Sequence, residues 1–169
     1  MEDQPDWVTL TEGESVVWQG RPIVYPYLGG VSTGLIIILL GVVVWLVVQG
    51  VILDFSIPSF IPSGIIVGVL VVLGILVALK PILDWWSIKY LITTDEVYKK
   101  QGMVSRTVKN LSLDKVQNTS FTQSVMGRLF SYGNVQIDTA GGGGTEMVFN
   151  SVKDPESVVG HITRQIDKR

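Results

Sequence analysis

The sequence predicts a two-helix transmembrane hairpin followed by a small, mainly-β domain with about seven antiparallel strands and a C-terminal α-helix. Three observations support this prediction. Residues 28–83 contain only two charged side chains, Asp54 and Lys80, whereas residues 84–169 contain eleven Lys and Arg against nine Asp and Glu. The first of these regions holds two long apolar runs. The second alternates polar with β-branched residues, as strands with one buried face do.

Both apolar runs are long enough to cross a membrane as helices. Residues 31–53 (VSTGLIIILLGVVVWLVVQGVIL) carry no charge, and a helix of this length extends about 34 Å, which exceeds a hydrocarbon core of roughly 30 Å. Residues 63–83 (SGIIVGVLVVLGILVALKPIL) form a second run, and Pro58 and Pro62 disfavour a continuous helix between the two. We therefore expect an N-terminal segment over 1–27, a hairpin over 28–83 and a separate domain over 84–169.

The cations predict that both termini lie in the cytoplasm of a multi-pass cell-membrane protein. The segment between the helices has no Lys or Arg, whereas Arg21 precedes the first helix, and Lys80, Lys89, Lys99 and Lys100 lie at or beyond the end of the second. A secretory signal peptide is the competing interpretation of the first run. That run is longer than a typical signal-peptide core and follows acidic residues rather than a basic segment, so the hairpin is favoured.

Small residues recur four positions apart in both apolar runs. Such pairs let helix backbones approach closely, and they could pack the two helices together or join neighbouring copies. Glycine is also simply common in membrane helices, which is the alternative explanation. The candidate packing residues are Gly30, Gly34, Gly64, Gly68, Gly74 and Ala78.

Short β-rich segments fill the region after residue 84. SIKYLITT, at residues 87–94, precedes a turn at Asp95 and Glu96, and Gly102 and Asp114 mark further turns. The later segments of the same character are VYKKQG, MVSRTVKNLSL, VQNTSFTQ, NVQIDTAG and TEMVFN. The four glycines at 141–144 lack the residues that follow a phosphate-binding loop, so we expect a hairpin tip there.

Two short elements complete the expected domain. The link SVMGRLFSYG is expected to close the end of the barrel with Met126, Leu129 and Phe130. Asp154 is expected to cap a C-terminal helix that starts at Pro155. The apolar stripe of that helix, expected to pack on the strands, is Val158, Val159, Ile162 and Ile166.

The run LSLDKVQNTSFTQSVMGRLFSYGNVQIDTAG, preceded by YLITTDEVYKKQG and two membrane helices, resembles the prokaryotic pleckstrin-homology-like (PH-like) domains of membrane-flanked proteins, the YdbS-like group. The resemblance covers residues 85–167, and LTEGESVVWQGRP, at 10–22, is similar to the usual entry into the first membrane helix. It implies a PH-like architecture with two nearly orthogonal antiparallel sheets closed by the C-terminal helix. The four-glycine loop departs from the more varied hairpin usual in relatives.

Basic residues near the membrane are the candidate contacts for a partner or for anionic headgroups. These candidates are Lys99, Lys100, Arg106, Lys109 and Lys115, together with Gln117 and Arg128. The interleaved acids Asp95, Glu96 and Asp114 favour a merely solvated face over a binding surface. Nucleic-acid binding is not expected, because the chain has no strongly basic face with stacking aromatics.

The sequence offers no chemistry that would indicate an enzyme. With one His and no Cys, no catalytic residue, metal site or cofactor is predicted, and Asp114 and Asp138 are single carboxylates in polar strands. The leading hypothesis is therefore a non-enzymatic, membrane-anchored binding or scaffold module that presents the PH-like domain at the cytoplasmic membrane face to an unidentified protein or to its own copies. The alternative is an oligomeric subunit of a membrane pore or transport assembly.

Overall fold

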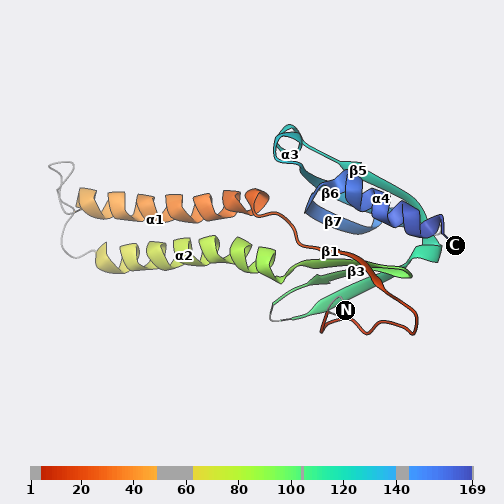
Figure 1. Ribbon diagram of the computed structural model, residues 1–169. Helices are drawn as coiled ribbons and strands as arrows, with labels where there is room; N and C mark the ends of the chain where they lie inside the picture. Colours follow the sequence, from red (N-terminus) through yellow and green to blue (C-terminus); the bar gives the residue numbers. More distant parts are fainter. Residues whose placement is uncertain (1–4, 49–62, 104, 140–144, 169) are drawn as a thin grey trace. The chain divides into compact units, whose positions relative to one another are not determined.

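The structure is a computed structural model that describes residues 5–48, 63–103, 105–139 and 145–168. The chain divides into two compact units (Figure 1). One unit, called the β unit below, combines Met1–Ile23 with Ser87–Arg169, and the other, the helical unit, is Val24–Trp86. The helical unit is thus an insertion into the chain of the β unit.

The helical unit contains a short 3-10 turn, η1 (Tyr25–Tyr27), and two long helices, α1 (Leu28–Val48) and α2 (Ser63–Ser87). Helix α1 begins at Leu28 rather than at the expected residue 31, and α2 continues beyond the expected residue 83. Each helix is long and apolar enough to cross a membrane. The expected end of the first span at residue 53, and the segment with Asp54, Pro58 and Pro62, lie outside the described residues.

Small residues line the contact between α1 and α2. A Cβ added at Gly34 would lie 2.5 Å from the Gly74 carbonyl oxygen and 2.6 Å from Ala78 Cβ, and one added at Gly30 would meet Pro81 at 2.8 Å. These four predicted packing residues, Gly30, Gly34, Gly74 and Ala78, therefore lie between the two helices of one chain. Gly64 and Gly68 do not, because a Cβ at either position would meet nothing within 4 Å.

The β unit consists of two antiparallel sheets (Figure 1). The first has the order β1 (Val16–Gly20), β2 (Lys89–Thr93), β3 (Glu96–Gln101) and β4 (Thr107–Ser112). The second has the order β5 (Val116–Thr122), β6 (Tyr132–Thr139) and β7 (Thr145–Lys153). A 3-10 turn, η2 (Leu113–Lys115), links the sheets, α3 (Val125–Leu129) joins β5 to β6, and α4 (Pro155–Ile166) follows β7. The glycine loop at 141–144 lies outside the described residues.

Strand β1 comes from the segment that we expected to be separate from the domain. It pairs antiparallel with β2, with Gln19 opposite Leu91 and Gly20 opposite Tyr90. The expected division at residues 1–27 therefore needs correction, because residues 16–20 belong to the sheet. Sequence reasoning missed this strand because its pairing partner lies beyond the whole helical hairpin.

An aromatic contact joins the two sheets at the centre of the core. The rings of Tyr90 on β2 and Phe149 on β7 stack with their centroids 4.3 Å apart, and both side chains are fully buried. The Tyr90 hydroxyl donates to the Asn150 carbonyl oxygen and accepts from the Asn150 N–H. Both hydrogen-bonding functions of this buried hydroxyl are thereby satisfied. Val158 and Ile162 of α4 belong to the same core, as the apolar stripe predicted.

The N-terminal residues cover the other face of the first sheet. Val8 is buried against Leu91 and Tyr98, and the buried Glu14 carboxylate accepts a hydrogen bond from the Thr93 hydroxyl and from the Thr11 N–H. Burial of Tyr98 raises the pKa of this tyrosine above its ordinary value, and the carboxylates of Glu96 and Glu14 raise it further; the Tyr98 hydroxyl donates to Glu14 Oε1 at 3.4 Å. A second, smaller core therefore attaches residues 7–16 to the sheet.

Two local expectations were wrong. Met126, Leu129 and Phe130 do not close a barrel, since all three side chains are exposed and only Gly127 of α3 is buried. Asp154 precedes Pro155 as expected, but it adopts a φ of 48° and makes no side-chain cap. The backbone N–H of Asp154 donates to the Ser131 carbonyl oxygen at 2.9 Å. This bond holds the turn between β7 and α4.

The raised pKa of Tyr98 predicts a tyrosine that ionises late. The stability contributed by the neutral phenol is complete below about pH 10, the ordinary tyrosine value, and is lost as the pH rises further, because folding favours the protonated form. Ultraviolet titration of full-length protein in detergent should give the same tyrosinate signal for the wild type and Tyr98→Phe up to about pH 11. One additional tyrosine titrating in the wild type below that pH would contradict the assignment.

Glycines between the two helices and glycines outside that contact should respond differently to the same substitution. A Leu at Gly74 would collide with Ile38, whose Cγ1 lies 2.5 Å from an added Cβ, and overpacking of this kind costs about 1–3 kcal/mol. Gly74→Leu should lower the thermal midpoint of the full-length protein in detergent, whereas Gly68→Leu should leave it unchanged. An equal loss in both variants would show that Gly68 also packs against a helix.

Candidate functional site

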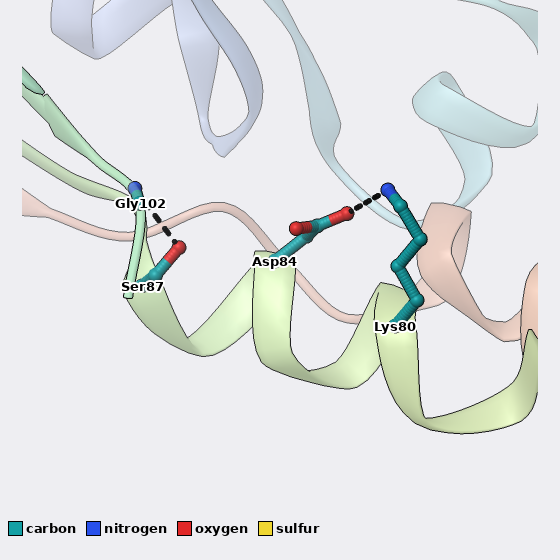
Figure 2. Close-up of polar contacts among 4 residues, drawn as sticks. All are labelled: Lys80, Asp84, Ser87 and Gly102. Carbon is teal, nitrogen blue, oxygen red and sulfur yellow. Dashed lines mark hydrogen bonds and ion pairs between the residues drawn. The ribbon is translucent and has the colours of Figure 1, made fainter. Parts of the chain in front are cut away.

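Both connections to the helical unit leave the same end of the first sheet. At this end Gly20 lies opposite Tyr90, Lys89 opposite Lys100, and Gln101 opposite Thr107. The Gly102 N–H in the β3–β4 turn donates to the hydroxyl of Ser87, the first residue of the returning chain, at 3.3 Å (Figure 2). We call this end of the β unit, where β1 and β3 finish and β2 and β4 begin, the helix-linked end.

The second sheet contributes to the helix-linked end through β7. The Ile23 N–H, at the point where the chain departs toward η1, donates to the Ser151 carbonyl oxygen at 2.7 Å. The preceding Pro22 forms a bridge with Val152, which is paired with Gly133 at the start of β6. Ser151 itself has a φ of 53°, in the left-handed region that non-glycine residues rarely occupy. The departing segment is therefore held against both sheets.

A shallow groove of about 600 Å³ lies at the helix-linked end, between the N-terminal residues and the first sheet. Its cationic side chains come from Arg21, which follows β1, and from Lys89, the first residue of β2. Asp6 contributes the single acidic group among its lining residues. The residues that line this basic groove are Pro5, Asp6, Trp7, Gln19, Gly20, Arg21, Lys89 and Tyr90.

Lys100 extends the positive charge beside the groove. Its Nζ lies 5.8 Å from the centroid of the Trp7 ring, within the roughly 6 Å range of a cation–π contact. Desolvation lowers the pKa of Lys100, and the neighbouring Arg106 and Lys89 lower it further, whereas Asp6 opposes the shift. Lys100, which is paired with Lys89 across β2 and β3, therefore lies close enough to Lys89 and to Arg106 for its charge to be repelled by each. An anionic group bound here would relieve that repulsion.

The structure separates Lys99 and Lys109 from this cluster. They are paired with each other across β3 and β4, and Lys99 lies on the same side of its strand as the core residue Val97. The Lys99 Nζ donates to the Val148 carbonyl oxygen at 2.8 Å, so this cation bridges the two sheets. Burial lowers the pKa of Lys99, and Lys109 adds to the effect. Lys99 therefore has a structural contact rather than a free ammonium group.

The remaining predicted contacts are dispersed. Lys115 ends η2, beyond the Glu96–Ser112 end of the first sheet and thus opposite the helix-linked end. Gln117 is exposed on β5, and Arg128 is exposed on α3. Of the seven predicted residues, Lys100 and Arg106 lie near each other at the helix-linked end, and Lys100 contacts the groove residue Trp7. Arg21 and Lys89 had been used only to orient the helices, and Trp7 carried no signal of its role.

A basic residue of α2 forms an ion pair with an acid on the same helix. The Lys80 Nζ lies 2.8 Å from Asp84 Oδ2, one turn further along α2 (Figure 2). Both side chains are exposed, so the pair contributes little to stability in water. It does neutralise the charge at this end of an otherwise apolar helix.

Two comparisons with known proteins gave different results. A search of curated proteins finds no match, whereas a scan against family models assigns the chain to a family. The family model described as "Bacterial PH domain" matches residues 23–166, which is most of the chain and includes both long helices as well as β2–β7 and α4. This match confirms the resemblance noted in the sequence, with two antiparallel sheets and a C-terminal helix where the PH-like fold places them. The chain belongs to the bacterial PH domain family.

Proposed function

We propose that this protein is a non-enzymatic binding module anchored in the cell membrane, with α1 and α2 crossing the bilayer and both termini in the cytoplasm. The apolar side chains that α1 and α2 expose, among them Leu35, Leu39, Ile65 and Leu76, support the anchor, because a soluble protein rarely exposes so large an apolar surface. The β unit is the part that recognises a protein partner or further copies of the chain.

The observation that carries this proposal is the attachment of both helices to one end of the β unit. Ile88 alone separates α2 from β2, and Ile23 and Val24 alone separate Pro22, bridged to β7, from η1. Two short links restrict the β unit far more than a single flexible tether would. The helix-linked end and its basic groove are thereby kept close to the membrane surface.

The chemistry of the basic groove favours an acidic ligand. Arg21 and Lys89 line it, and Lys100 lies beside it, so carboxylates of a partner would find three cations on one side of the β unit. Complementary charge of this kind increases the association rate and the specificity of binding more than it increases raw affinity. Trp7 adds an aromatic surface of the type that is enriched in protein interfaces.

In-cell photocrosslinking tests this role. A photoreactive residue at Gln19, an exposed position in the groove, should capture one protein reproducibly from native membranes, identified by mass spectrometry after mild extraction. Lys89→Glu in the same background should reduce the yield several-fold, because it reverses a groove charge.

The matched control places the same photoreactive residue at Lys115, which is exposed at the opposite end of the β unit, and Lys109→Glu controls for the charge change. Equal capture at both positions, or a yield that does not respond to Lys89→Glu, would contradict binding at the groove.

A second candidate function is an oligomeric subunit of a pore or transport assembly. One observation favours it: Gly64 and Gly68 form a small-residue pair on α2 that the α1 contact leaves uncovered. Such a pair could pack against a neighbouring copy. Chemical crosslinking in native membranes should then give a ladder of homo-oligomers that Gly68→Leu abolishes, while the binding-module proposal tolerates this change.

A further inference from the structure

The short helix α3 and the residue that follows it carry exposed apolar side chains. Val125, Met126, Leu129 and Phe130 have exposed fractions of 85%, 57%, 71% and 45%. We call these four residues the apolar tip. Single exposed apolar residues are ordinary, but four within six consecutive positions form a patch that marks an interaction site.

The apolar tip is held in place by ordered backbone contacts. The Ser124 hydroxyl accepts from the Gly127 N–H at 3.0 Å, and the Phe130 N–H donates to the Met126 carbonyl oxygen. Gly127 is buried against Tyr132, since a Cβ there would lie 2.5 Å from the Tyr132 carbonyl oxygen. The helix therefore turns its small residue toward the fold and its large apolar residues outward.

A chain of contacts places the apolar tip at the helix-linked end. Tyr132, which follows α3, is paired with Lys153, and the next residue, Gly133, is paired with Val152. Val152 is in turn bridged to Pro22, where the chain departs toward the helical unit. Met103 of the β3–β4 turn, at the same end of the first sheet, is a further exposed apolar residue, 57% accessible.

We propose that the apolar tip inserts into the interfacial region of the bilayer that α1 and α2 cross. This inference rests on the membrane anchoring proposed above. The bilayer is favoured as the occupant because the tip shares its end of the β unit with both short links, and because Arg128, exposed within α3, complements anionic headgroups. Five helical residues are also few for a protein interface, which ordinarily needs about 20–30 residues a side.

Single-cysteine fluorescence quenching tests the insertion directly, because the chain contains no cysteine of its own. Full-length Met126→Cys, labelled with an environment-sensitive fluorophore and reconstituted in vesicles of anionic and zwitterionic phospholipid, should be quenched by acyl-chain spin labels. Leu39→Cys on α1 reports whether the helices themselves are in the bilayer, and Asp167→Cys after α4 is the aqueous control.

The expected result is lipid quenching at 126 and 39 but not at 167, unchanged when the protein is diluted several-fold with lipid. Quenching at 39 alone would overturn the insertion and leave the anchoring intact, whereas no quenching at 39 would overturn the anchoring. A probe at 126 that is shielded only at high protein density would instead identify a second copy as the occupant.

A substitution at the tip separates insertion from a structural role. Leu129→Glu should reduce the quenching of the probe at 126 several-fold without lowering the thermal midpoint, because Leu129 is 71% exposed. Thr163→Glu, an exposed position on α4, introduces the same charge as a matched control and should change neither quantity. Undiminished quenching in Leu129→Glu would contradict insertion through the tip.

Discussion

The pairing of β1 with β2 determines how the rest of the molecule can be arranged. These strands are neighbours in the sheet, with Gly20 opposite Tyr90, although residues 21–88 separate them in the sequence. A hairpin of two strands is normally closed by a short turn, but here the turn is replaced by two long apolar helices. Both ends of the helical insertion must therefore leave from the same end of the sheet, where β1 finishes and β2 begins.

Several chemically distinct features lie at this helix-linked end. The basic groove with Arg21 and Lys89, the neighbouring Lys100, and the apolar tip of α3 all belong to the helix-linked end. Cations and exposed apolar side chains at one end of a domain are a combination that suits the interface of a bilayer with anionic lipids. The opposite end carries η2 and the C-terminal part of α4, which close the core instead. Under the proposed function, the helix-linked end would serve the membrane and a partner, while the opposite end closes the core.

The sequence predicted what depends on local pattern. Apolar length indicated both helices, alternation indicated β2–β7, and the stripe containing Val158 and Ile162 indicated the core face of α4. It could not reveal contacts between segments far apart in the chain, such as β1 with β2 or the Lys99 ammonium with the Val148 carbonyl. Met126 and Leu129 were assigned to the core because they are apolar, yet the buried Gly127 turns them outward. Lys115 and Lys100 looked like members of one basic surface, yet they lie at opposite ends of the β unit. The strand pairing that separates them cannot be read from local pattern.

The most direct test of this account is the side of the membrane on which each segment lies. Single-cysteine variants of the cysteine-free chain, at Ser56 between the helices, at Glu12 before β1 and at Asp167 after α4, can be treated with a membrane-impermeant maleimide in intact cells and after lysis. If both termini lie in the cytoplasm, only the position at 56 should react in intact cells, and 12 and 167 should react after lysis. Labelling of 12 and 167 on opposite sides would contradict it, because β1 and β2 could not then pair across the membrane.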